Sequence, residues 1–250
     1  MPLYQTGTSP RRRPVARSRR SGGSWLGWLL GKLVTLVVAA ALIAVAWALA
    51  YRWIDPPITV PMIRDAIAGQ HVDRHWVALD AISPAMTRAV IGAEDSTFCS
   101  HHGFDLAAIE QAAVRNATST KVRGGSTISQ QTAKNAFLWP GRSYVRKGLE
   151  AYFTVLIEAL WGKRRIMEVY LNIAELGPGV YGVDAAAHHY FDTSAARLTP
   201  DEAARLAAIL PQPIKRDAAD LHGKVRRHAR AIERRIGVVR RDQVDACLAG

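Results

Sequence analysis

Hydrophobic residues form one long unbroken run near the start of the chain. No charged residue occurs from Leu33 to Ala50, and the apolar segment as a whole covers residues 25–50. About 20 consecutive apolar residues are enough for a helix to cross the hydrocarbon core of a bilayer. Lys32 lies early enough to extend its charge to the head groups. Aromatic rings that suit the two interfaces flank the run, namely Trp25, Trp28, Trp47 and Trp53. The run predicts one transmembrane helix.

A cleaved signal peptide is the alternative explanation of this run. The apolar part of a signal peptide usually has about 7–15 residues and is followed by small residues at a cleavage site. Here the run is longer, and Tyr51, Arg52 and Trp53 follow it. We therefore expect an uncleaved anchor.

Beyond the run the pattern is that of amphipathic helices. Ser83 before Pro84, Ser143, and Thr199 before Pro200 are typical helix starts, because a serine or threonine oxygen caps free N–H groups and proline fits the first turn. We expect one helix to run to about Glu94 and another to contain residues 146–161. No alternating run of useful length predicts a strand, so the fold class is mainly α.

Composition divides the chain into five parts. Residues 1–24 carry six arginines and no acid, which predicts a disordered basic arm. The transmembrane helix covers 25–50, and the proline-rich segment 51–61 predicts an extended stalk. We expect the globular domain over 62–215 and a basic helical C-terminal tail over 216–250.

Charge gives the expected orientation. Basic residues that flank a membrane helix stay in the cytoplasm, so the chain after about residue 50 should lie outside the cytoplasmic (inner) membrane. The net charge is +12, but residues 1–50 contain seven bases and no acid, which leaves 26 bases against 21 acids in the remainder. Most of the basicity is therefore a topology signal, and we expect no nucleic-acid partner.

Two cysteines, Cys99 and Cys247, are too few to form a disulfide framework. An oxidising compartment would permit a bond between them, but their spacing does not show whether the side chains meet. The pairing stays open at this stage.

Four polar clusters are candidates for chemistry. Glu94 and Asp95 end an apolar helical segment, where partial desolvation would raise a carboxyl pKa and make it a proton acceptor near neutral pH. Residues 123–135 combine paired glycines, a helix start and Lys134, as in an anion or sugar cradle. Residues 142–150 and 162–172 add further bases and acids. Taken singly, each cluster also fits an ordinary loop or a surface ion pair.

Five segments occur in one order along residues 60–215: EDSTFCSHHGFD, RGGSTISQQTAKN, RKGLE, GKRRIMEVYLN and GPGVYGVDAAAHHYF. Together they resemble the successive motifs of the peptidoglycan glycosyltransferase family. The resemblance implies a lysozyme-like, mostly helical domain with a membrane-associated lobe, which polymerises lipid II into β-1,4-linked glycan and releases undecaprenyl diphosphate. No transpeptidase domain follows, so we expect a monofunctional biosynthetic member rather than a bifunctional penicillin-binding protein.

The resemblance also implies roles for single residues. Two catalytic positions are matched: Glu94 matches the catalytic base, and Glu150 matches a second glutamate that orients bases or a bound ion. Substrate-binding positions around the sugar and diphosphate match Gln131, Lys134, Arg146 and Lys147. The supporting positions are Asp95, Phe98, His101, Gly125, Ser126, Thr127, Asn135, Lys163, Glu168 and Asn172.

Neither a cofactor nor a resident metal is required on this pattern. The adjacent His188 and His189 point about 100° apart on a helix, which is poor geometry for one shared metal. A divalent cation (Mg²⁺ or Mn²⁺) at the diphosphate is compatible with the family. The expected partners are lipid II, the growing lipid-linked glycan and membrane lipids, with other cell-wall synthesis and division proteins as further candidates.

Two other functions fit parts of the pattern. A lysozyme-like glycan-cleaving enzyme would also use a glutamate, but as a general acid, and it has no need for three clustered cations. A non-catalytic membrane-anchored cell-wall scaffold would need no base at Glu94.

Overall fold

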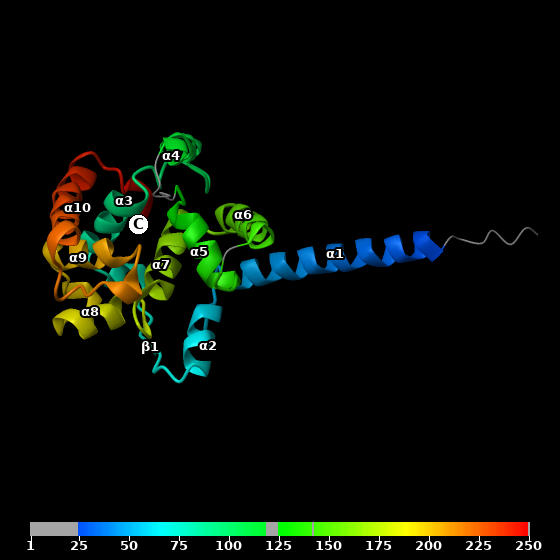
Figure 1. Ribbon diagram of the computed structural model, residues 1–250, viewed down its shortest axis with the longest axis horizontal. Coiled ribbons are helices and arrows are strands. Elements are labelled where there is room, and N and C mark those ends of the chain that lie inside the picture. The colour runs from blue at the N-terminus through cyan, green and yellow to red at the C-terminus, as the bar shows by residue number, and fades with distance from the viewer. Residues whose placement is uncertain (1–24, 119–124, 142, 250) are drawn as a thin grey trace, which may run out of the picture. The chain divides into compact units, whose positions relative to one another are not determined.

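The computed structural model describes residues 25–118, 125–141 and 143–249 (Figure 1). The basic arm expected at 1–24 lies outside the described residues, as do Arg123, Gly124 and Arg142. The chain forms two compact units. The first ends at Leu42, within the apolar segment, and the second starts at Ile43.

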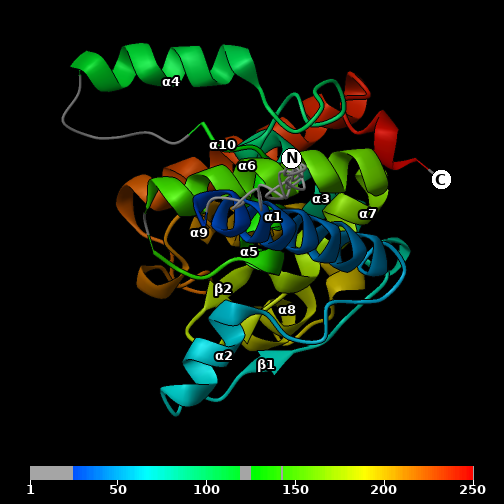
Figure 2. The ribbon, with the colours of Figure 1, turned by 90° about the vertical axis from the view of Figure 1, so that its right-hand side faces the viewer.

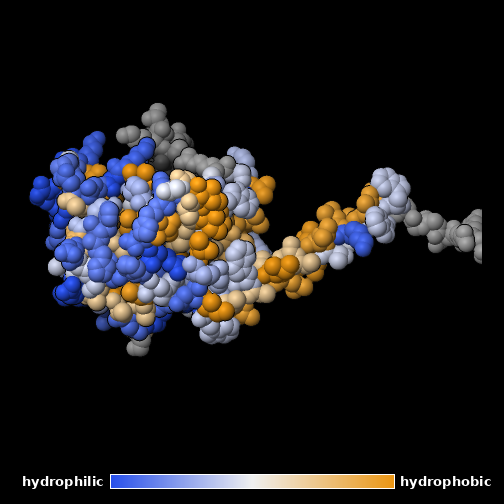
Figure 3. Space-filling view, turned by 90° about the horizontal axis from the view of Figure 1, so that it is seen from below, coloured by the Kyte–Doolittle hydropathy of each residue, from blue (hydrophilic) through white to orange (hydrophobic). Residues whose placement is uncertain are grey.

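The apolar run forms a single helix, α1 (Trp25–Ala50), as predicted. In the described part of the chain, α1 is the one helix that is long and apolar enough to cross a membrane. Of its residues only Ala48 is buried, whereas the core helix of a soluble protein would be mostly buried. Figure 3 shows apolar side chains over most of the surface of α1.

The last residues of α1 belong to the core of the second unit. Trp47 packs edge-on against Phe137 and Phe153, with ring centroids 5.2 and 6.2 Å away. The indole Nε1 of Trp161 donates a hydrogen bond of 2.7 Å to the backbone oxygen of Ala48. The end of the membrane-type helix is therefore fixed in place by packing and by a buried hydrogen bond.

The segment expected to form an extended stalk over 51–61 does not stand free. Arg165 donates to the backbone oxygens of Tyr51 and Ile54 at 3.0 Å and pairs with Asp55 at 2.9 Å. Arg74 donates to the oxygen of Pro56 at 2.6 Å. Pro56 and Pro57 keep this part of the segment out of a helix, although the next helix already begins at Val60, and the free carbonyls before it are acceptors for arginines of the domain.

Helices make up most of the second unit, which confirms the mainly α-helical fold class. Among the described residues they are α2 (Val60–Ile67), α3 (Pro84–Glu94), α4 (Leu106–Thr118), α5 (Ile128–Phe137), α6 (Tyr144–Leu160), α7 (Lys163–Ile173), α8 (Val183–Phe191), α9 (Pro200–Ile209) and α10 (Gly223–Arg241). Short 3₁₀ turns cover Leu79–Ala81, Ala195–Arg197, Pro213–Lys215 and Ala246–Leu248.

Two helical groups meet in this unit. One consists of α3, α9 and α10, which pack against one another, and in the other α5 packs against both α6 and α7. Within the unit, α4 and α2 lie at opposite ends (Figures 1 and 2). The predicted caps are present, since Ser83, Ser143 and Thr199 accept hydrogen bonds from backbone N–H groups of α3, α6 and α9.

A small sheet lies beside α8 and was not expected from the sequence. Its strands are β1 (Asp73–Arg74), β2 (Glu175–Gly177) and β3 (Val180–Tyr181), in the order β1-β3-β2. β3 pairs in parallel with β1 and antiparallel with β2. Strands of two or three residues are too short to show alternation, so no periodic pattern could predict them.

The C-terminal segment is part of the core rather than a tail that starts at residue 216. Helix α10 packs against α9 and α3 through an apolar stripe, formed by Ala229, Ile232, Ile236 and Val239. Arg235 donates from Nη1 to the oxygen of Gly92 at 3.0 Å. The other faces of α10 carry many arginines, so the overall composition of the helix is basic and does not reveal this stripe. The spacing of the apolar residues is nevertheless that of a helix.

Cys99 and Cys247 form a disulfide bond in the structure, with their Cα atoms 5.5 Å apart. The bond joins the loop after α3 to the last 3₁₀ turn across a sequence separation of 148 residues. A crosslink that closes so long a loop removes much of the conformational freedom of the unfolded chain.

We predict that the double variant Cys99→Ser/Cys247→Ser loses about 2–5 kcal/mol of unfolding free energy. The measurement is urea unfolding of the detergent-solubilised chain. A reducing agent should destabilise the wild type by a similar amount and leave the double variant unchanged. A wild type that does not respond to reduction would contradict the assignment.

Candidate active site

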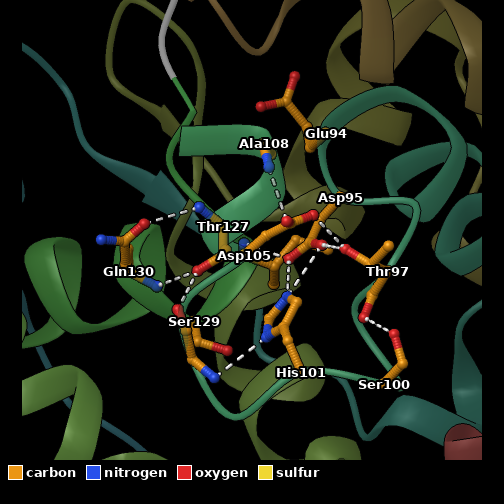
Figure 4. Close-up of polar contacts among 12 residues, drawn as sticks. Glu94, Asp95, Thr97, Ser100, His101, Asp105, Ala108, Thr127, Ser129 and Gln130 are labelled. Atoms are coloured by element: carbon orange, nitrogen blue, oxygen red, sulfur yellow. Dashed lines mark hydrogen bonds and ion pairs between the residues drawn. The ribbon is translucent and has the colours of Figure 1, made fainter. Parts of the chain in front are cut away.

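Glu94 is the last residue of α3, at the point where two helical groups meet. Ser83 caps this helix and Pro84 occupies its first turn, so the helix starts as its sequence predicts. Asp95 follows with a non-helical backbone and ends the helix. The Glu94 side chain points away from the polar cluster below it, as Figure 4 shows.

The carboxylate of Glu94 is partly buried and accepts one hydrogen bond, of 2.9 Å, from Nε2 of Gln131 on α5. Desolvation raises the pKa of Glu94 above its ordinary value, and the charge of Asp95 raises it further. The hydrogen bond from Gln131 and the charge of Lys134 act in the opposite direction. A carboxylate with a raised pKa and few donors is suited to accept a proton.

Tyr170 holds Gln131 in place and is not among the site residues expected from the sequence. Its hydroxyl donates to Oε1 of Gln131 at 3.3 Å, while the ring is fully buried on α7. Burial raises the pKa of Tyr170 well above the usual range, so the hydroxyl stays a donor. With Oε1 occupied by this donor, the amide of Gln131 presents its NH₂ group to Glu94.

Asp95 lies inside the protein and joins the loop after α3 to the N-terminus of α5. Both of its oxygens lie 3.0 Å from Nε2 of His101, and Oδ2 also accepts the backbone N–H of Ile128 at 2.9 Å (Figure 4). Nδ1 of His101 accepts the N–H of Gly103 at 3.0 Å, which places the ring proton on Nε2. His101 thus donates to Asp95 and does not face Glu94.

The N-terminus of α5 borders a cavity of about 210 Å³ that Glu94 also lines. Thr127 forms the capping box with Gln130 and donates its hydroxyl to the oxygen of Gly103 at 2.6 Å. Gly125 and the exposed Ser126 line the same cavity. A Cβ at Gly125 would lie 3.2 Å from the oxygen of Ala108, so glycine allows the loop to approach α4 closely.

Lys134 lies one turn after Gln131 on α5 and lines a second cavity of about 300 Å³. Arg146, Asn135 and Trp139 line it too, as do Arg64 and Glu175, which the sequence did not indicate. Desolvation lowers the pKa of Lys134, the charge of Glu150 raises it, and Arg146 and Lys147 lower it. Four cations (Arg64, Lys134, Arg146 and Lys147) outnumber the two carboxylates of Glu150 and Glu175 around this partly desolvated cavity, and the excess positive charge favours an anion.

Glu150 fixes two of these cations. It is buried on α6 and accepts Nη1 of Arg146 at 3.1 Å and Nζ of Lys147 at 2.5 Å. Arg146 is buried as well, whereas the side chain of Lys147 is half exposed. Spacings of four and three residues bring these side chains to one face of the helix.

Four of the expected supporting residues line neither of the two cavities. Lys163 donates to the backbone oxygen of His101 at 2.8 Å and to Glu158 at 2.7 Å, and its ammonium stands 4.6 Å from the ring centre of the buried Phe98. Glu168 accepts the N–H of Leu79, and Asn172 pairs with both backbone groups of Val77. These contacts position loops rather than touch a ligand.

Sequence comparison decides the family. A family model described as Transglycosylase matches residues 62–239. The chain belongs to this transglycosylase family. It is therefore a glycosyltransferase, and the matched region extends through most of α10, in agreement with the packing of that helix.

Relatives of this family cover nearly the whole chain. A biosynthetic peptidoglycan transglycosylase of Caulobacter vibrioides is 52% identical over 88% of this chain and 95% of its own length. The protein of the same name from Rhodospirillum centenum is 50% identical over 88% and 96%. That of Xanthomonas campestris pv. campestris is 49% identical over 89% and 90%.

Two of the carboxylates near the cavities already have protein partners. Glu150 is paired with two cations, and Asp105 accepts Thr97 Oγ1 at 2.6 Å and the N–H of Ala108 at 2.8 Å. Hard cations such as Mg²⁺ bind through free carboxylate oxygens and substrate phosphates. The divalent cation that the family pattern allows stays a prediction.

We predict that Gln131→Leu raises the pKa of Glu94. The substitution removes the hydrogen bond that favours the ionised carboxylate, so the carboxylate protonates at a higher pH than in the wild type. Carboxyl ¹³C NMR of glutamate-labelled protein measures this titration. Gln70→Leu, at an exposed glutamine after α2, is the matched control and should leave the titration unchanged. A shift to lower pH in Gln131→Leu would contradict the assignment.

Proposed function

We propose that this chain polymerises lipid II into β-1,4-linked glycan strands, with Glu94 as the general base and release of undecaprenyl diphosphate. The observation that carries the proposal is the order of groups along one face of α5. Gln131 contacts the desolvated Glu94 carboxylate, and Lys134, one turn on, enters the cation-lined cavity. A base and an anion site lie side by side, as transfer from a diphosphate donor requires.

The proposed step is a single displacement. Glu94 accepts the proton of the acceptor sugar's 4-hydroxyl as that oxygen forms a bond to the anomeric carbon of the donor. The bond between this carbon and the diphosphate oxygen breaks, and its electron pair leaves with the lipid diphosphate. In-line attack converts the α-linked donor to a β-linked product, so the reaction inverts configuration.

The leaving group explains the cations. A diphosphate is a stable anion, and its departure needs charge stabilisation more than strong protonation. Lys134, Arg146 and Lys147 are the groups that supply this charge in the proposal. Glu150 keeps Arg146 and Lys147 in position before substrate arrives, which reduces the reorganisation needed in the transition state.

Membrane anchoring fits a lipid-linked substrate, and two observations support a domain outside the cytoplasm. Disulfide bonds persist in oxidising compartments, and Cys99 is bonded to Cys247. The arginines of residues 1–24 favour a cytoplasmic N-terminus. The packing of Trp47 and Ala48 into the domain supports an anchor that is not cleaved.

We predict that Glu94→Gln lowers the rate of lipid II polymerisation by about 10²–10⁴-fold, because the base is removed while the shape is kept. Binding of a lipid diphosphate analogue should remain. Glu233→Gln on α10 is the control and should retain full activity. Unchanged turnover in Glu94→Gln would refute Glu94 as the base, whereas a wild type that binds the analogue but forms no polymer would favour the scaffold function.

The same preparation tests the glycan-cleaving alternative. Wild-type enzyme should form polymer from lipid II and leave purified glycan at its original length. Shortening of purified glycan without polymer formation would refute the proposed synthase.

We predict that Lys134→Ala and Arg146→Ala each weaken binding of a lipid diphosphate analogue by about 10–100-fold, since each removes a charge-assisted hydrogen bond worth about 1.5–3 kcal/mol. Titration calorimetry in detergent measures this. Arg227→Ala, at an exposed arginine of α10, should bind like the wild type. Equal affinity in all four proteins would refute the cation assignment.

A further inference from the structure

Three potential metal ligands meet on the surface outside the cavities that border Glu94 and Lys134. His75 follows β1, and Asp184 and His188 lie one turn apart on α8. Their ligand atoms all lie within 4.8 Å of one another. Helix α8 lies at the end of the unit away from α4 (Figures 1 and 2). The transferase chemistry uses none of these three residues.

Their spacing fits coordination better than hydrogen bonding. Oδ2 of Asp184 lies 3.6 Å from Nδ1 of His75 and 3.5 Å from Nε2 of His188. Good N–H···O hydrogen bonds are shorter, at about 2.7–3.2 Å. Ligands about 2.1 Å from a tetrahedral zinc ion stand about 3.4 Å apart. The two separations are close to this edge length, and one carboxylate oxygen is shared by both histidines.

A hydrogen bond orients Asp184, and a longer contact places a carboxylate beside His75. The other ring nitrogen of His75, Nε2, faces Oδ1 of Asp73 at 3.4 Å. The second oxygen of Asp184, Oδ1, accepts the backbone N–H of Ala195 at 2.8 Å. Metal-binding histidines commonly direct their second ring nitrogen to a carboxylate, which fixes the ring and strengthens the ligand. Oδ2 of Asp184 is thereby left directed toward the histidines.

The ligand types select the class of metal. Two imidazoles and one carboxylate suit zinc and similar transition metals, whereas Mg²⁺ and Ca²⁺ prefer oxygen ligands alone. The side chains of His75 and His188 are 56% and 49% exposed, and that of Asp184 is 11% exposed. Solvent can therefore reach the cluster and supply a fourth ligand, while the carboxylate is held in place by its burial.

We propose that His75, Asp184 and His188 bind a zinc ion, with water as the fourth ligand. The ion joins the segment after β1 to α8, two parts of the chain that are more than 100 residues apart. Without the ion, the short pairing of β1 with β3 holds this region together. Binding to the folded state alone stabilises the domain by mass action. The site is separate from the transferase cleft and does not depend on the proposed reaction.

The test uses the full chain without an affinity tag, in detergent and after treatment with a chelator. Titration calorimetry with Zn²⁺ should give one site per chain in the wild type. His75→Ala and His188→Ala should each weaken this binding by more than about tenfold, and Asp73→Asn by about tenfold or more. The neighbouring exposed His189 is a matched control, so His189→Ala should bind like the wild type.

Two further measurements separate coordination from simple ion pairing. Co²⁺ in place of Zn²⁺ should give the visible absorption of a tetrahedral site in the wild type and in His189→Ala, but not in His188→Ala. Circular dichroism without metal should be the same in all variants, which excludes misfolding as the cause. No binding by the wild type, or equal binding by His188→Ala and His189→Ala, would overturn the proposal and leave the cluster as two histidines beside Asp184 without a metal.

Discussion

The arrangement around Glu94 depends on the hydrogen bonds of the buried Asp95 carboxylate. It accepts His101 from the loop after α3 and the backbone N–H of Ile128 at the start of α5. A buried carboxylate and the free N–H groups of a helix N-terminus are each unfavourable without a partner, and here they satisfy one another. Because this contact joins α3 to α5, Glu94 at the end of one helix lies beside Gln131 on the other.

Two adjacent acids acquire different properties from their surroundings. Asp95 is surrounded by donors inside the protein, whereas Glu94 receives one side-chain hydrogen bond and faces a cavity. Desolvation therefore dominates at Glu94 and raises its pKa. The same face of α5 continues to Lys134, so one helix presents an amide to the carboxylate of Glu94 and an ammonium to the second cavity. The rigidity of a short, well-capped helix keeps these groups at a fixed separation.

Much of the helical fold could be predicted because its signals are local. Caps such as Thr199 with Glu202 form within four residues, and they occur in the structure as the sequence indicates. Other features had no local signal. Strands of two or three residues show no alternation, and the arginines of α10 conceal the apolar stripe that packs it into the core. The sequence also did not show that the segment expected to be a free stalk is bound to the domain. The arginines that bind it, such as Arg165, come from far along the chain.

By itself the sequence determined the helical class, the apolar helix α1, the order of the motifs and which residue types carry the chemistry. Tertiary structure decided which of these residues lie next to one another. The bond between Cys99 and Cys247 and the hydroxyl of Tyr170 behind Gln131 join positions far apart in the chain. Periodicity identifies the buried face of a helix, but it does not name the partner across that face. That choice is made only when the helices pack, because close packing fixes which side chains fill the same space.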